Sequence, residues 1–282
     1  MKKILVPTDF SSNAFKAAEY AANIAIKSDA VIYLLHVIEP VADSIRQPYP
    51  LHGKLKEEIT VSRMRELKLF QQSIHQRYPG ITTEMAAASG TISTCILEFA
   101  AEKEINLIVM GTRGASGLKE IFMGTVAADT ITRTKIPVLA VPDEYMFEMP
   151  DAILFTTRFF EKSTYLLNAL VEIATIFKAA IYVAVFIDTD MAETTDYSSN
   201  TRQLKEYIDF LMKAFPGIDF NGSLVTGKEF EETVELYNER NEVDIIAMIT
   251  YPKGFWEKLL QKSVTRKMAF HSKIPVLAIP VN

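Results

Sequence analysis

A glycine-rich segment in the first half of the chain has the composition of a phosphate-binding loop. It runs from Gly111 to Val126 and follows a short apolar stretch, Leu107–Met110. Glycines let backbone amides approach phosphate oxygens because no Cβ intervenes, and the N-terminus of a following helix adds positive partial charge. The segment contains neither the P-loop pattern nor Gly-x-Gly-x-x-Gly. Considered alone, it is as typical of a plain strand-to-helix connection as of a phosphate site.

Alternating strands and helices must position this segment. Ile4–Pro7, Val31–Val37 and Pro137–Val141 are short continuous apolar runs, whereas Ala14–Ala25 has apolar residues at helical spacing. Continuous apolar strands indicate burial on both faces, as in a parallel sheet covered by helices. The remaining strands are expected at 81–87 and 107–110, and the remaining helices at 54–78, 92–102 and 127–133. This order predicts a doubly wound α/β domain with a five-stranded parallel sheet.

The second half of the chain repeats this pattern. Three segments align in the same order: Lys3–Phe10 with Ala152–Phe159, Val31–Val37 with Ala180–Phe186, and Lys135–Pro142 with Lys273–Pro280. Agreement at three separate places indicates an internal duplication. We therefore expect two tandem, Rossmann-like domains, residues 1–145 and 151–282, each with a five-stranded parallel sheet flanked by helices.

The complete spacing within the glycine-rich segment is more specific than its composition. Two residues separate Gly111 from Gly114, and nine more precede the pair Gly124 and Thr125. This spacing resembles the pattern of ATP-binding universal stress proteins. The same half carries the family's other segments, Ile4–Ser11, Leu34–Ile38 and Lys135–Leu139. The resemblance covers the whole first half, and in the second half it depends on the repeat.

The resemblance implies an adenine-nucleotide site in the first half. Asp9 is expected beside the nucleoside, with Pro7 and Thr8 shaping the turn, and the backbone of Val37 is expected at the adenine. The residues implied on the ribose and phosphate side are Met110, Gly111, Arg113 and Gly114, with Gly124, Thr125 and Val126 as phosphate donors. The implied ligand is ATP, with AMP or ADP as alternatives and Mg²⁺ or Mn²⁺ as an optional companion. These segments all follow strands, at the edge where doubly wound sheets bind ligands.

Some of these residues also have simpler structural roles open to them. Asp9 is a suitable N-cap for the helix that begins near Ser11. His36 lies in an apolar strand and corresponds to Val185 in the repeat, which favours a packed, hydrogen-bonded histidine over an acid or base. For Arg113, the alternative to a phosphate contact is a side chain that points into solvent. The four histidines and one cysteine show no spacing typical of a zinc site.

The second half departs from the family pattern at its diagnostic positions. Arg158 stands opposite Asp9. Opposite Gly111, Gly114, Gly124 and Thr125 stand Ile249, Pro252, Lys262 and Ser263. An isoleucine side chain and a proline ring without an amide would obstruct a phosphate cradle. We therefore expect one nucleotide site per chain. Whether the second half is a scaffold or holds a different ligand stays open.

Composition favours a soluble, cytoplasmic protein. Hydrophobic residues make up 49% of the chain and charged residues 23%, and the net charge of -5 argues against a nucleic-acid partner. The longest apolar run, Ala179–Ile187, is shorter than the ~18 residues that span a bilayer, so no membrane partner is expected. The first residues show no signal-peptide pattern.

The preferred hypothesis is a stress-response regulatory protein that binds one adenine nucleotide. A slow ATPase or nucleotidyl-transfer enzyme on the same architecture is the alternative, although no motif places a general base beside the loop. A structural stress protein that binds no nucleotide is the third. The last strands, Pro137–Val141 and Pro275–Ile279, would be unpaired edges in separate domains. We therefore expect them to pair the halves as an intrachain pseudo-dimer, with association of two chains into a homodimer left open.

Overall fold

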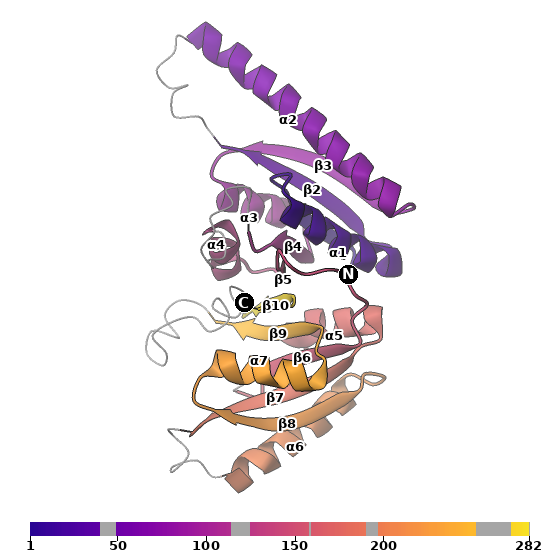
Figure 1. The fold of residues 1–282 in the computed structure, drawn as a ribbon, viewed down its shortest axis with the longest axis vertical. Coiled ribbons are helices and arrows are strands. Elements are labelled where there is room, and N and C mark those ends of the chain that lie inside the picture. Colours follow the sequence, from indigo (N-terminus) through magenta and orange to yellow (C-terminus); the bar gives the residue numbers. More distant parts are fainter. Residues whose placement is uncertain (40–48, 114–124, 158, 190–196, 252–271, 282) are drawn as a thin grey trace.

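In a computed structural model, the two halves of the chain form one ten-stranded sheet, in which an edge strand of the first half pairs with an edge strand of the second (Figure 1). The structure describes residues 1–39, 49–113, 125–157, 159–189, 197–251 and 272–281. The first half contains β1 (Lys3–Pro7), α1 (Ser12–Ser28), β2 (Val31–Ile38), α2 (Tyr49–Arg77), β3 (Thr82–Ser89), α3 (Ile92–Glu102), β4 (Leu107–Gly111), α4 (Thr125–Arg133) and β5 (Val138–Val141). The second half contains β6 (Ala152–Thr157), α5 (Thr164–Phe177), β7 (Ala180–Asp188), α6 (Tyr197–Ala214), β8 (Phe220–Gly227), α7 (Phe230–Asn241), β9 (Ile245–Thr250) and β10 (Val276–Pro280).

The strand order is β3-β2-β1-β4-β5-β10-β9-β6-β7-β8. Within each half all five strands run parallel, which confirms the predicted fold class. Strand and helix positions agree with the prediction to within a few residues, except that α2 begins at Tyr49 rather than at 54.

Helices cover both faces of the sheet and explain the continuous apolar strands. α1, α2, α5 and α6 bury side chains in the core on one face, and α3, α4 and α7 bury side chains in the core on the other. Successive residues of β1 alternate between these cores: Ile4 and Val6 face the first, and Leu5 faces the second. Because both faces of each inner strand are buried, neither face requires polar residues.

β5 and β10 join the halves by antiparallel pairing. Leu139 lies opposite Leu277, and Val138 lies opposite Ala278. These four side chains are at most 2% exposed. The last strands therefore form the pairing that the sequence predicts for them, and each removes the other's open edge. The sheet therefore continues from one half into the other through this antiparallel pair.

α1 lies close to the sheet and brings its first turn toward the ends of β1 and β4. It contacts both strands, and its buried stripe includes Ala17, Ala21 and Ala25, each at most 3% exposed. Small side chains allow a helix to approach a sheet closely. Ser11 caps the helix, because its hydroxyl accepts the amide of Ala14 at 3.2 Å. The position of this first turn matters for the site described below.

The connection between the halves is held by an aromatic cluster. The ring of Phe147, in the connection, meets the ring of Tyr20 from α1 edge-on at 5.1 Å and that of Phe177 from α5 at 6.4 Å. Tyr145 adds a further ring 6.1 Å from Tyr20. Burial raises the pKa of Tyr145 to about 12. These contacts fix the connection between two helices that also pack against each other.

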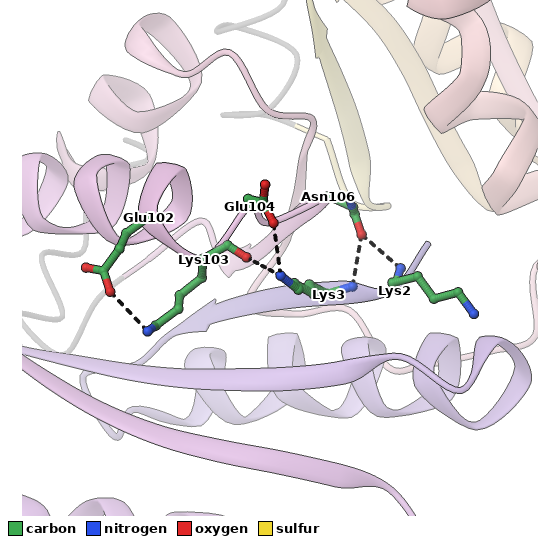
Figure 2. Close-up of polar contacts among 6 residues, drawn as sticks. All are labelled: Lys2, Lys3, Glu102, Lys103, Glu104 and Asn106. Carbon is green, nitrogen blue, oxygen red and sulfur yellow. Dashed lines mark hydrogen bonds and ion pairs between the residues drawn. The ribbon is translucent and has the colours of Figure 1, made fainter.

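Hydrogen bonds at the amino ends of the strands repeat in both halves. In the first half, the Oδ1 atom of Asn106 accepts the amides of Lys2 and Lys3 at 2.9 and 3.0 Å (Figure 2). In the second half, the Oδ2 atom of Asp244 accepts the amides of Asp151 and Ala152 at 2.8 and 2.9 Å. The duplication therefore extends to individual hydrogen bonds at the entry to β1 and to β6.

Leu139→Ala tests whether the junction makes the two halves one folding unit. Removing this buried side chain should cost about 2–5 kcal/mol of unfolding free energy. Because the sheet continues across the junction, far-UV and near-UV circular dichroism should report the same lowered transition. Leu69→Ala on α2, where the side chain is 60% exposed, should change the unfolding free energy by less than ~0.5 kcal/mol. Two separate transitions in the parent protein would contradict a shared unit.

Candidate functional site

The ends of β1, β2 and β4 lie at the carboxyl edge of the first-half sheet, where β1 has β2 on one side and β4 on the other. The direction in which the chain adds strands therefore reverses between β1 and β4. Ligands of doubly wound sheets bind at such switch points. This is where the structure brings together the predicted segments 7–9, 37 and 110–113.

The turn after β1 is fixed by its own side chains. Thr8 is buried, its amide donates to the carbonyl of Leu35 at 2.9 Å, and its hydroxyl accepts the amide of Phe10 at 3.0 Å. The Oδ1 atom of Asp9 accepts the amide of Ser11 at 3.0 Å. Asp9 is exposed on this turn. Because Ser11 is the N-cap of α1, the alternative in which Asp9 caps the helix is wrong.

His36 packs against this turn and stabilises it through two contacts. Its Nδ1 atom lies 2.8 Å from the carbonyl oxygen of Thr8. Since a carbonyl only accepts, Nδ1 carries the proton. The imidazole stacks on Phe10 with ring centroids 4.4 Å apart. This confirms the packed, hydrogen-bonded role over the acid–base role. Val37, the next residue, is 9% exposed near the end of β2, beside the turn that carries Asp9.

A buried asparagine, Asn13, holds the first residues after β4. Its side chain is 2% exposed, its Nδ2 atom donates to the carbonyl of Val141 at 3.0 Å, and its Oδ1 atom accepts the amide of Arg113 at 2.8 Å. A Cβ on Gly111 would lie 2.4 Å from that same Oδ1 atom. Gly111 is therefore a glycine because α1 presses Asn13 against it. The sequence analysis did not identify Asn13. Its one sequence signal is a polar residue on the alanine stripe of α1.

The side chain of Arg113 turns toward the segment after β5. Its guanidinium lies 3.7 Å from the Oδ2 atom of Asp143. Lys16 of α1 donates to the backbone carbonyl of the same aspartate. The arginine and aspartate side chains are 42% and 35% exposed, so their ion pair is weak and exchangeable. Arg113 is thus engaged by a carboxylate rather than fully solvated.

Polar contacts hold α4, the helix that follows the glycine-rich segment. The hydroxyl of Ser93 donates to Asp129 at 2.5 Å, and the guanidinium of Arg133 donates to the same carboxylate at 2.8 Å. These bonds tie α4 to α3. Thr125 is the first residue of α4, and Val126 follows it partly buried. Met110, at the end of β4, is 4% exposed. The predicted Gly114 and Gly124 lie outside the described residues.

In the second half the corresponding backbone position is filled. Ile249 pairs with Ile279 of β10 in the same way that Gly111 pairs with Val141 of β5. Ile249 is 6% exposed. In the repeat alignment Phe15 corresponds to Thr164, the first residue of α5, so the helical turn that carries Asn13 has no counterpart. Arg158, Pro252, Lys262 and Ser263 lie outside the described residues.

A carboxylate also occupies the switch point of the second half. Glu161 accepts hydrogen bonds from the hydroxyls of Thr157, at the end of β6, and Tyr251, just after β9. The hydroxyl of Tyr207 donates to the Glu161 backbone carbonyl at 2.8 Å. Burial, and after it the glutamate, raises the pKa of both tyrosines well above the ordinary value. Both tyrosines therefore remain protonated and act as hydrogen-bond donors.

Comparison with known proteins assigns both halves to one family. The model of the Universal stress protein family matches residues 1–142 and again residues 149–280. The chain belongs to the universal stress protein family. A universal stress protein of Methanocaldococcus jannaschii is 37% identical over 141 residues, which cover 50% of this chain and 81% of that protein. Universal stress protein YxiE of Bacillus subtilis is 29% identical over 146 residues, 49% of this chain and 97% of its own length.

The tandem arrangement also occurs in a solved universal stress protein. A crystal structure from Archaeoglobus fulgidus matches 99% of this chain and 98% of its own chain, with a TM-score of 0.70 and 21% sequence identity. At this identity the match shows the shared two-domain fold. Among the described residues no helix combines the length and apolar character needed to cross a membrane. In the same described part, no group of three or more His, Cys, Asp or Glu residues has a metal-binding arrangement.

Glu161→Ala tests whether this carboxylate stabilises the closed second half. The substitution removes the acceptor of the Thr157 and Tyr251 hydroxyls, so we expect a loss of about 1–3 kcal/mol in urea unfolding. Glu161→Gln keeps a side-chain oxygen as acceptor and should cost less. The matched control is Glu206→Ala on α6, whose 65% exposed carboxylate forms an i,i+4 pair with Arg202 and should contribute less than ~0.5 kcal/mol. Equal stability of Glu161→Ala and the parent would show that the network is not stabilising.

Proposed function

We propose that the first half binds one adenine nucleotide and that the chain is a stress-response regulatory protein that responds to this nucleotide. The ligand is ATP, or AMP or ADP. The observation that carries the proposal is the convergence of three family-pattern segments at one switch point: the turn at Asp9, the strand end at Val37 and the backbone at Gly111. Adenine would lie against the Val37 backbone and the nucleoside beside Asp9.

The phosphates would lie between the root of the glycine-rich loop and α4. The residues assigned to this side are Met110, Gly111, Arg113, Gly114, Gly124, Thr125 and Val126, with Pro7 and Thr8 supporting the turn opposite. Backbone amides and the positive end of α4 suit a multiply charged anion. Mg²⁺ or Mn²⁺ would arrive with the nucleotide. The buried Asn13 supports this assignment, because its hydrogen bonds to Val141 and Arg113 fix the backbone at the start of the glycine-rich segment.

The asymmetry between the halves supports a single site per chain. In the second half, Ile249 replaces the glycine and Glu161 occupies the switch point with a negative charge. A nucleotide there would have to displace a hydrogen-bonded carboxylate and bring its own negative charge. We therefore infer that the second half has no nucleotide site and serves as a counterpart that pairs with the first through β10.

Calorimetric titration of the full chain with MgATP tests the number of sites. We expect one site per chain, with similar results for ADP if the adenosine contacts dominate. Two equivalent sites, or no binding with or without a divalent ion, would contradict the proposal.

Gly114→Pro should weaken this binding without unfolding the protein. The substitution removes one amide and restricts the backbone on the phosphate side, so we expect an affinity loss of about 1–3 kcal/mol. The second half carries Pro252 at the corresponding sequence position, so the fold should tolerate proline. Ser263→Thr in the second half is the matched control and should add no site. A folded Gly114→Pro variant with parental ATP affinity would remove the glycine loop from the proposed site.

Asp143→Asn should strengthen nucleotide binding. The Asp143 carboxylate pairs with Arg113 at 3.7 Å and therefore competes with phosphate for the same guanidinium. An exposed pair of this kind contributes ~0.2–1 kcal/mol, so we expect a gain of about 1.5- to 5-fold in ATP affinity at low salt. The gain should shrink at ~1 M salt, where the Debye length is about 3 Å. Glu102→Gln makes the same charge change at the end of α3, where the carboxylate pairs with Lys103 (Figure 2), and should leave affinity unchanged. Weaker binding by Asp143→Asn would contradict the competition.

A further inference from the structure

Asn13 connects three parts of the first half through one buried side chain. It lies in the first turn of α1, donates to the last residue of β5 at 3.0 Å and accepts the amide of Arg113 at 2.8 Å. An amide buried to this degree is costly unless its donor and acceptor are both used. In Asn13 the Nδ2 donor and the Oδ1 acceptor each form a hydrogen bond with a backbone group. The side chain therefore holds the residues after β4 at a fixed distance from both α1 and β5.

Asn13 and Gly111 form a matched pair. The two atoms nearest to a Cβ built on Gly111 are the Oδ1 and Cγ atoms of Asn13, at 2.4 and 2.6 Å. Any side chain at Gly111 would have to expel the asparagine amide from its position. The second half has lost both members: Ile249 stands in place of the glycine, and α5 begins after the corresponding turn. Joint loss is expected if the two residues serve one purpose.

We propose that Asn13 is a positioning residue for the nucleotide loop, an inference that rests on the proposed function. Its Oδ1 atom accepts the Arg113 amide and so fixes the backbone from which the glycine-rich segment continues after β4. Its Nδ2 atom anchors that orientation to Val141, the end of the strand that joins the two halves. Gly111 contributes indirectly, because its missing Cβ leaves the space that Asn13 occupies. Asn13 itself touches no part of the nucleotide.

A double-mutant cycle tests the proposal with the full chain and MgATP as the probe. Asn13→Ala should lower ATP affinity ~10-fold, which corresponds to 1.4 kcal/mol, while circular dichroism at the titration temperature stays unchanged. Gly111→Ala should lose at least as much, because its Cβ displaces the asparagine amide. In the double variant the Oδ1 and Cγ atoms are gone, and the nearest remaining atom is the backbone carbon of residue 13, at 3.2 Å. Adding Gly111→Ala to Asn13→Ala should therefore cost less than ~2-fold, a strong departure from additivity.

The matched control is Asn23→Ala on the same helix. The Nδ2 atom of Asn23 donates to the carbonyl of Glu19 at 2.9 Å, away from the loop, so ATP affinity should not change. A folded Asn13→Ala variant with parental affinity would overturn the positioning role while the proposed function stands. Additive losses across the cycle would overturn the pairing of Asn13 with Gly111. No ATP binding by the parent protein would overturn both the proposed function and this inference.

Discussion

The antiparallel pairing of β5 with β10 sets the geometry on which the rest of the molecule depends. Each strand would be an open edge in a separate domain, and each buries Leu139 or Leu277 against the other half. Four strands, β4, β5, β10 and β9, lie between β1 of the first half and β6 of the second. The two switch points are therefore separate, and each is built by residues of its own half.

The two switch points differ by a small number of side chains. In the first half, Gly111 leaves space for the Asn13 side chain, which holds the amide of Arg113. In the second half, Ile249 stands at the position of the glycine, and Glu161 accepts hydrogen bonds from hydroxyls at the ends of β6 and β9. Among the described residues, a glycine-to-isoleucine difference and one carboxylate thus distinguish the two switch points. The fold and the junction are the same in both cases, so the asymmetry is local.

Sequence reasoning reached the fold because its signals are local. Continuous apolar runs such as Ile4–Pro7 predict strands buried on both faces, and the open-edge argument predicts the pairing of the halves. The packed role of His36 followed from its apolar strand. Asn13 was not found, because its importance depends on contacts with Val141 and Arg113 that only the folded sheet creates. The closing contact between Glu161 and Tyr251 escaped for the same reason: it joins residues brought together by the pairing of β6 with β9.

Hydrogen–deuterium exchange measured by mass spectrometry, with and without saturating MgATP, tests the central claim most directly. That claim is that one half holds the nucleotide and the other is closed. Exchange should slow in peptides covering residues 7–13, 36–38 and 110–126, because amides there would be bonded or covered. Peptides covering residues 156–161 and 245–251 should exchange at unchanged rates. Protection centred on the second set, or equal protection in both halves, would contradict the account.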